Sequence, residues 1–310
     1  MSMEKYKRNN VYQMVTDRVI EQLKKGIIPW HRPWTVIVGA INYVTRKPYS
    51  LINQVLLGRE GEWITFKQLK ELGGSIKKGA KAGLVVFYGK YTYTKEETEE
   101  NEDGEEVTVA KEYTIPVLRY YKVFHISDCT GIESKMGSEP VTIASEPIER
   151  AEKIINGYVE REEGLKFKND EQSNQAFYRP SDDLVVVPMI SQYSVTEEYY
   201  STAFHELTHS TMTESRCNRK KENKMAAYGS ADYSREELVA ELGSAMLCTI
   251  AELNCEKAFT NSVAYIQGWL HALENDNKMI VWAASRAEKA ARYIIGEEGG
   301  NKSNFVKMMK

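Results

Sequence analysis

The chain of 310 residues has few cysteines, few histidines and no long apolar stretch. Its four cysteines include no CxxC pair, so we expect free thiols in a reducing cytoplasm instead of a disulfide framework. No segment approaches the roughly 20 consecutive apolar residues that a membrane-spanning helix needs, and we expect no membrane partner. The first ten residues, MSMEKYKRNN, are polar and do not resemble a signal peptide. We therefore predict a cytoplasmic protein.

The formal net charge of −3 hides an uneven distribution of charge along the chain. Residues 1–94 hold 16 Lys and Arg against 6 Asp and Glu, whereas the remaining residues hold 25 against 38. A basic segment of this size is typical of a surface that meets an anion, and nucleic acid is the commonest large one. A solvated basic surface without a partner is the alternative, and charge alone does not decide between them.

The length of the chain and a stretch of turn-forming residues near its middle predict two domains. Residues 129–142 combine turn residues with no hydrophobic periodicity, which is typical of a linker. We predict a first domain over residues 1–130, a linker over 131–143 and a second domain over 144–310. Sheet and helix signals are segregated in both halves, which indicates an α+β fold.

Hydrophobic periodicity places the elements within these domains. Apolar residues at spacings of three and four predict helices over 11–25 and near 145–161, 195–213, 234–253, 257–274 and 277–296, and Thr65 is a candidate cap for another. The β-branched and aromatic runs at 84–94 and 113–126 predict strands, and residues 175–189 predict a hairpin. The eight acidic residues within 96–106 predict a solvated hairpin tip or a disordered loop.

The stretch STAFHELTHSTM, residues 201–212, contains two histidines four positions apart. On a helix such residues project from one face, so His205 and His209 can direct ring nitrogens at one ion. The H-E-x-x-H arrangement is typical of a zinc site in which the glutamate, here Glu206, serves as general base. A pair of surface histidines is the alternative. The apolar residues that would hold this helix in a core are Tyr200, Ala203, Phe204 and Leu207.

A zinc site that keeps a position open for water needs a third protein ligand. Downstream, Glu237 and Glu241 lie four residues apart on the largely apolar helix SREELVAELGSAML, and we expect Glu236 to point elsewhere. Because a buried carboxylate without a partner is costly, these two side chains are expected to face a metal ion or a histidine. The two helices together predict a bound divalent ion.

The chemistry expected of this constellation is hydrolysis of a peptide bond. Zinc lowers the pKa of its water to about 7, and Glu206 can take the proton as that water attacks a polarised carbonyl. The strand DLVVVPM is expected beside the cleft as an edge that pairs with an extended peptide. Tyr228 and Tyr233 are candidates to donate a hydrogen bond to the developing oxyanion, and simple packing is the alternative for each.

Aromatic and basic residues are interleaved in the first 94 residues. This mixture is typical of proteins that bind single-stranded nucleic acid, because cations follow the phosphates and aromatic faces stack on unpaired bases. The sequence shows no helix-turn-helix or zinc finger of a duplex reader. The alternative is that the tryptophans belong to the core and that Trp30 and Trp34 only brace a turn.

Several separated motifs resemble one known family. In order they are VYQMVTDRVIEQLKKGIIPWHRPW, KPYSLINQVLL, EWITFKQLKELGGSIKKGAKAGLVVFYGK and LRYYKVFHI, then HELTH and YSREELVAELGSAML. The first four resemble the N-terminal domain of the ArdC-type antirestriction proteins, and the last two are similar to the zincin-like metallopeptidase domain joined to it. The stretch KPYSLINQVLL departs from the family, which often has a glycine before Ile-Asn. The acidic insertion at 95–106 is a second departure.

The resemblance implies a protein that binds single-stranded DNA, carries a zinc-dependent peptidase-like domain and protects the incoming DNA of a plasmid from host restriction. It implies His205, His209 and Glu237 as ligands of one zinc ion per chain, Glu206 as the base, and Glu241 as a residue that orients a histidine ring. Tyr233 is our candidate for the second catalytic residue. The residues that we predict to contact DNA are Trp30, Arg32, Trp34, Lys47, Tyr49, Asn53, Lys77, Lys78 and Lys81.

Two other functions remain open at this point. The chain could be a metallopeptidase whose N-terminal domain recruits a protein substrate, such as a host restriction protein. It could also be a DNA-binding protein whose metal centre is structural or vestigial.

Overall fold

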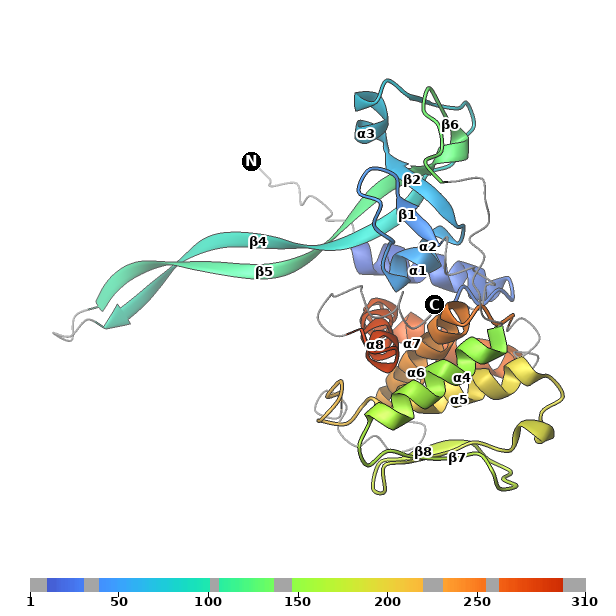
Figure 1. Ribbon diagram of the computed structural model, residues 1–310. Helices are drawn as coiled ribbons and strands as arrows, with labels where there is room; N and C mark the ends of the chain where they lie inside the picture. Colours follow the sequence, from blue (N-terminus) through green and yellow to red (C-terminus); the bar gives the residue numbers. More distant parts are fainter. Residues whose placement is uncertain are drawn as a thin grey trace.

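The computed structural model describes residues 10–30, 39–100, 106–136, 147–219, 231–254 and 262–297. Within these ranges helices and strands are segregated, which confirms the predicted α+β class. A small sheet with a long two-stranded extension lies on one side of a group of helices, and a second small sheet lies on the other side (Figure 1).

The first sheet has the strand order β1-β2-β5-β4. Its strands are β1 (Ala40–Asn42), β2 (Gly61–Thr65), β4 (Gly83–Glu100) and β5 (Glu106–His125). β1 is parallel to β2, and the other two pairings are antiparallel. The short strands β3 (Ser75–Ile76) and β6 (Cys129–Thr130) form a separate pair, and a 3-10 turn (Ile126–Asp128) joins β5 to β6.

Three helices accompany this sheet: α1 (Val11–Lys24), α2 (Leu51–Leu57) and α3 (Phe66–Glu71). In α1 the predicted apolar positions Val15, Val19 and Leu23 are buried, and the chain leaves the helix at Gly26 with a positive φ of 73°. Thr65 caps α3 as predicted, with Gln68 completing a capping box.

The strands β4 and β5 form a ribbon that is longer than the two sequence runs indicate. They pair without interruption from Gly83 opposite Val123 to Glu100 opposite Glu106, and the ribbon projects away from the rest of the molecule (Figure 1). Acidic residues 96–100 therefore continue a strand instead of forming a loop, while residues 101–105 lie outside the described residues.

The second half contains α4 (Pro147–Arg161), α5 (Thr196–Ser210), α6 (Ala231–Ile250), α7 (Ser262–Asn275) and α8 (Met279–Ile294). Each lies where periodicity predicts a helix, to within a few residues. A three-stranded sheet consists of β7 (Lys166–Lys168), β8 (Phe177–Arg179) and β9 (Leu184–Val186), and a 3-10 turn (Ile190–Gln192) leads to α5. No described helix is long and apolar enough to cross a membrane.

The hairpin expected over residues 175–189 is confirmed as β8 and β9, but the predicted edge position of β9 is wrong. β9 is the central strand, antiparallel to β8 on one side and parallel to β7 on the other. The parallel partner comes from residues 166–168, before the hairpin, so no local pattern announces it. Because both sides of β9 are already paired, a peptide cannot add to this strand.

The two halves of the chain share a hydrophobic core. One buried cluster contains Val15 and Val19 of α1, Leu238 and Leu242 of α6, and Ile280 of α8. Polar contacts cross the same boundary: Thr16 Oγ1 donates to the backbone carbonyl of Asn277 at 2.8 Å, and Leu51 N donates to Glu288 Oε2 at 3.0 Å. The boundaries 1–130 and 144–310 stay a prediction, and the linker residues 137–143 lie outside the described residues. Because of this shared core, we expect the two halves to fold as one unit.

Candidate metal centre

His205 and His209 lie on one face of the helix α5 because they are four residues apart. The apolar face of the same helix is held in the core. Tyr200, Ala203, Phe204 and Leu207 are all essentially inaccessible to solvent, as the sequence predicts. The side chains of His205 and His209 keep 19% and 12% of their surface exposed. The rings therefore lie at the wall of the helix bundle, where a small ligand can still reach them.

A glycine brings α6 close to this face. A Cβ at Gly243 would lie 2.6 Å from Cγ2 and 2.7 Å from Oγ1 of Thr208 on α5, a distance that real Cβ atoms do not adopt. Two turns along α5, Ser244 Oγ donates to the carbonyl of Ser201 at 2.7 Å. The close crossing lets a side chain of α6 reach the histidines.

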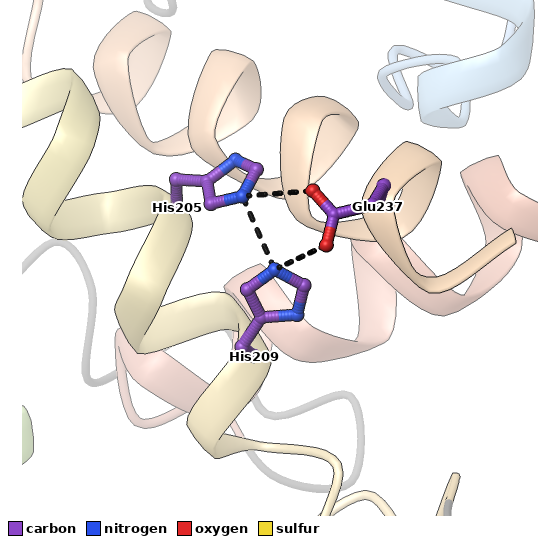
Figure 2. A group of neighbouring side chains, drawn as sticks. All are labelled: His205, His209 and Glu237. Carbon is purple, nitrogen blue, oxygen red and sulfur yellow. Dashed lines mark hydrogen bonds and ion pairs between the residues drawn. The ribbon is translucent and has the colours of Figure 1, made fainter. Parts of the chain in front are cut away.

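The side chain that reaches them is Glu237 (Figure 2). His205 Nε2 and His209 Nε2 lie 3.1 Å apart, His205 Nε2 lies 3.5 Å from Glu237 Oε2, and His209 Nε2 lies 3.4 Å from Glu237 Oε1. Zinc bonds of about 2.0–2.1 Å in a tetrahedron require donor separations of about 3.3–3.4 Å. Each histidine nitrogen faces a different oxygen of Glu237 at close to this separation, and one ligand atom from each of the three residues lies within 4.8 Å of the other two. Three such donors are the number that a zinc site with one open position needs.

The charges of this cluster favour a cation. Burial disfavours the imidazolium forms, but hydrogen bonds to Glu236 and Glu237 outweigh it and raise the pKa of His209 to about 10. Burial also lowers the pKa of His205, but the hydrogen bond to Glu237 together with the charges of Glu241 and Glu206 outweighs it, and the pKa is raised. Burial by itself would raise the pKa of Glu237, yet the two histidines hold it well below its usual range. The negative charge of these carboxylates stabilises a positive charge at the histidines, whether a proton or a metal ion carries it.

The predicted base, Glu206, follows His205 in α5 and is 8% exposed. Its charge contributes to raising the pKa of both histidines, so its carboxylate lies in their vicinity. Both other predicted positions in the glutamate helix are also near the rings: Glu237 as above, and Glu241, whose Oε1 lies 3.8 Å from His205 Nδ1. That distance suits a residue that orients His205 better than a ligand.

The expectation that Glu236 points elsewhere is wrong. Glu236 Oε1 lies 3.5 Å from Nδ1 of His209, on the opposite side of the ring from Glu237. Neighbouring residues on a helix are about 100° apart, but an imidazole offers one nitrogen on each side. Glu236 and Glu237 therefore hold the two nitrogens of His209 between them.

Glu236 is held in turn by Arg219, a residue that the sequence analysis missed. Arg219 is 2% exposed and donates to Glu236 Oε1 at 2.6 Å and Oε2 at 3.1 Å. It also donates to Thr211 Oγ1 at 2.7 Å and to the carbonyl of Thr208 at 2.9 Å, both at the end of α5. Burial would raise the pKa of Glu236, but His209 and Arg219 keep it lowered. Since Arg219 lies in a loop without periodicity, no sequence signal marks it.

Two predicted tyrosines cannot be placed against the site. Tyr228 lies outside the described residues, and Tyr233 lies in the first turn of α6 with its side chain outside them. The role of Tyr233 in catalysis stays a prediction.

The residues predicted to contact DNA separate into three groups. Lys47, Lys77, Lys78 and Lys81 are exposed, whereas Arg32 and Trp34 lie outside the described residues. Trp30, Tyr49 and Asn53 are buried, with 2%, 8% and 0% of their surface exposed.

The burial of Trp30 and Asn53 has a structural reason. Trp30 packs in the core that the two halves share. The amide of Asn53 donates to the carbonyl of Val86 at 2.9 Å and accepts from its N–H at 2.7 Å, which fixes α2 to β4. In this conformation neither side chain is available to DNA, contrary to the prediction.

Two family models match the chain, one in each half. Residues 9–124 match the N-terminal domain of anti-restriction factor ArdC, and residues 151–286, which contain the metal cluster, match a zincin-like metallopeptidase. The crystal structure of the antirestriction ArdC protein from plasmid R388 in its metal-free form is 30% identical, with a TM-score of 0.68 over 96% of this chain and 98% of that chain. Its Mn(II)-bound form gives 0.69 over 94% and 100%.

Curated relatives extend this picture. Two DNA primases TraC of Escherichia coli are 32% and 31% identical, but the chain spans only 27% and 20% of their length. The protein y4eC of Sinorhizobium fredii is 28% identical over 95% of its length. The order of the two matched domains and the near-complete coverage of the R388 protein agree with the metal cluster found here, and the chain belongs to the ArdC-type family of antirestriction proteins.

Proposed function

We propose that this protein protects the incoming DNA of a mobile element from host restriction. In this proposal the N-terminal half binds single-stranded DNA and the C-terminal half is a metal-dependent peptidase. The observation that carries it is the meeting of His205, His209 and Glu237 at the spacing of a metal site, in a chain similar to an antirestriction protein. We propose a cytoplasmic location, as expected for a protein that acts on DNA entering a cell.

Zinc is the ion that we propose, at one ion per chain. Two imidazoles and one carboxylate are a ligand set of catalytic zinc sites that keep one position open. The related R388 protein has a Mn(II)-bound structure, so manganese is the alternative occupant. Imidazole donors favour zinc over manganese in the general order of divalent affinities, which supports zinc.

The arrangement supports hydrolysis of a peptide bond. A zinc ion held by this cluster would supply a Lewis acid that polarises a carbonyl and makes a nearby water more acidic. The carboxylate of Glu206 would take the proton from that water as it attacks, and would deliver it to the leaving amine. Glu236 and Glu241 would hold the rings of His209 and His205 in place, and Tyr233 would donate to the oxyanion.

The charge of the N-terminal half supports binding to DNA. Lys47, Lys77, Lys78 and Lys81 are exposed and can follow phosphates. Arg32 and Trp34 stay in the proposed set, while the burial of Trp30, Tyr49 and Asn53 removes those three from it.

The test uses the full chain, because its halves share a core. Cells with an active restriction system, producing either the protein or its Glu206→Gln variant, are transformed with unmodified plasmid. We expect the variant to bind zinc and single-stranded DNA normally and to lose protection. Glu197→Gln is the matched control, since Glu197 lies in the first turn of α5, two turns from His205.

Each alternative function predicts a different result. Full protection by a zinc-loaded Glu206→Gln variant would favour a DNA-binding protein with a structural metal centre. Failure of the unaltered protein to bind single-stranded DNA at low salt would favour a metallopeptidase whose N-terminal half recruits a protein substrate.

A further inference from the structure

The β4–β5 ribbon is divided into two halves of different chemistry. Its inner half, residues 84–95 paired with 111–122, contains five Lys and Arg, a single acidic residue and seven aromatic rings. Its outer half, residues 96–100 paired with 106–110, contains five acidic residues, no basic residue and no ring. The rings therefore coincide with the part of the ribbon that attracts anions.

The pairing of the strands places most of these rings on one side. Residues directly opposite each other share a face, so odd-numbered residues of both strands lie together. We call this the aromatic face, and it consists of Phe87, Tyr91, Tyr93, Tyr113, Arg119 and Tyr121. The other face carries Thr92, Thr94 and Thr114, with Tyr88 and Tyr120 near the body of the protein.

The side chains of the aromatic face are exposed to solvent. Phe87, Tyr91 and Tyr121 are 46%, 44% and 45% exposed, and Tyr93 is 37% exposed. Large apolar groups that are grouped and exposed mark sites of interaction more often than single ones do.

The rings form two groups of neighbours. The ring centroids of Phe87 and Tyr121 are 5.9 Å apart. The centroid of Tyr93 lies 6.0 Å from that of Tyr91 and 5.7 Å from that of Tyr113, and the rings of these two pairs are nearly parallel. Phe87 also lies 6.2 Å from Tyr49, a residue predicted from the sequence to contact DNA. Tyr49 is buried, and the rings run outward along the ribbon from the body of the sheet.

A glycine and an arginine connect the two groups. Gly89 lies between Phe87 and Tyr91, and a Cβ there would lie 3.1 Å from Nε and 3.4 Å from Cζ of Arg119. The guanidinium group of Arg119 therefore lies beside Gly89, in the space that a side chain would fill. Arg119 thus lies on the aromatic face between the two groups of rings.

We propose that the aromatic face binds single-stranded DNA, with bases stacked on its rings and on Arg119 and phosphates attracted by the inner half of the ribbon. This inference rests on the proposed function and assigns a place to its DNA-binding part. Aromatic rings accept any base, while the paired bases of a duplex expose no face for them. The acidic outer half repels phosphates, so the bound strand ends near Lys95 and Lys111, both of which already contact Glu97.

The test compares two double variants of the full chain. Tyr91→Ala/Tyr93→Ala removes two rings of the aromatic face, and Thr92→Ala/Thr94→Ala alters the same strand on the opposite face. The probe is a labelled single-stranded oligonucleotide of about 16 nucleotides, followed by fluorescence anisotropy at several salt concentrations. We expect the tyrosine variant to bind at least about tenfold more weakly and the threonine variant to bind as the unaltered protein does.

Two further variants separate stacking from charge. Tyr91→Phe/Tyr93→Phe keeps both rings and is expected to keep the affinity. Arg119→Ala is expected to weaken binding and to reduce the dependence of the affinity on salt by about one phosphate contact. All five substituted positions are exposed, so circular dichroism and zinc content should be unchanged.

The results distinguish this inference from the function on which it rests. If the unaltered protein does not bind single-stranded DNA at low salt, the DNA-binding part of the proposed function fails. If it binds and the tyrosine double variant binds equally well, the aromatic face is not the DNA site and the proposed function stands. A tyrosine variant that binds DNA normally but loses protection would assign the face to a protein partner and would also overturn the inference.

Discussion

Gly243 of α6 lies so close to Thr208 of α5 that a Cβ on the glycine would come within 2.6 Å of the threonine methyl group. This contact sets the distance between the two helices that supply the metal ligands. Two histidines on one helix have only two donors to offer. The third donor, from Glu237, reaches them because the helices cross at a residue without a side chain.

We predict that Gly243→Ala lowers zinc affinity by about tenfold or more, because the added methyl group pushes α6 and its glutamates away from α5. Stability should fall by about 1–3 kcal/mol, as for other additions to a packed core. Zinc titration and thermal unfolding measure the two effects.

The control for this prediction is Gly268→Ala in α7, where a Cβ would meet nothing within 4 Å. That change should stabilise the protein by up to about 1 kcal/mol through helix propensity. Adding Thr208→Ala to Gly243→Ala should restore part of the lost zinc affinity. If Gly243→Ala bound zinc as tightly as the unaltered protein, the close crossing would not control the site.

Glu237→Ala should abolish stoichiometric zinc binding, because two histidines alone hold zinc weakly. Glu241→Ala should weaken binding by only about 10–100-fold, since Glu241 is placed to orient His205 instead of binding the ion. Metal analysis after dialysis gives the zinc content per chain. Retention of one zinc per chain by Glu237→Ala would refute its assignment as a ligand.

Glu236→Gln is expected to affect both metal affinity and stability. It leaves the buried Arg219 without its counter-charge, which costs about 3–5 kcal/mol in comparable cases. It also removes a carboxylate from Nδ1 of His209, so zinc affinity should fall by about 10–100-fold.

Glu252→Gln separates these two consequences. Glu252 pairs with Arg150 of α4, which is also 2% exposed, but it follows the C-terminal end of α6, whereas Glu236 lies near the N-terminal end. This variant should lose stability and keep its zinc affinity. Equal zinc affinities for the two variants would show that Glu236 serves only to pair with Arg219.

Asn53→Ala should reduce stability without changing the affinity for DNA. The buried amide makes two hydrogen bonds to Val86, and each backbone group left unpaired costs about 1–3 kcal/mol. Thermal unfolding and titration with a single-stranded oligonucleotide, at a temperature where the variant is folded, test both statements. A folded variant with weakened DNA binding would return Asn53 to the DNA-contacting set.

Local sequence patterns predicted most of the helices and strands and the two histidines at the centre of the site. The spacing of His205 and His209 already predicts that both lie on one helical face, because the period of a helix is a local property. The apolar stripe around Phe204 and the positions of the helices follow from the same period. The spacing of Glu237 and Glu241 on a largely apolar helix brought both to the site, and the family resemblance singled out Glu237 as the third donor.

The features that escaped prediction depend on contacts between distant segments. β9 is central because residues 166–168 pair with it. A strand of three residues is too short for its pattern to predict this pairing. Arg219 reaches Glu236 from a loop. Trp30 becomes a core residue only when the two halves pack together, and Asn53 is buried against Val86 of β4. A tryptophan beside basic residues has the same local sequence whether it stacks on a base or on the core.

The most direct test of the metal site is a crystal of the full chain grown with zinc and measured at the zinc absorption edge. We expect a single anomalous peak per chain, bonded at about 2.0–2.2 Å to Nε2 of His205, Nε2 of His209 and a carboxylate oxygen of Glu237. A peak at other residues, or no peak at these three, would contradict the assignment of α5 and α6 as the metal centre.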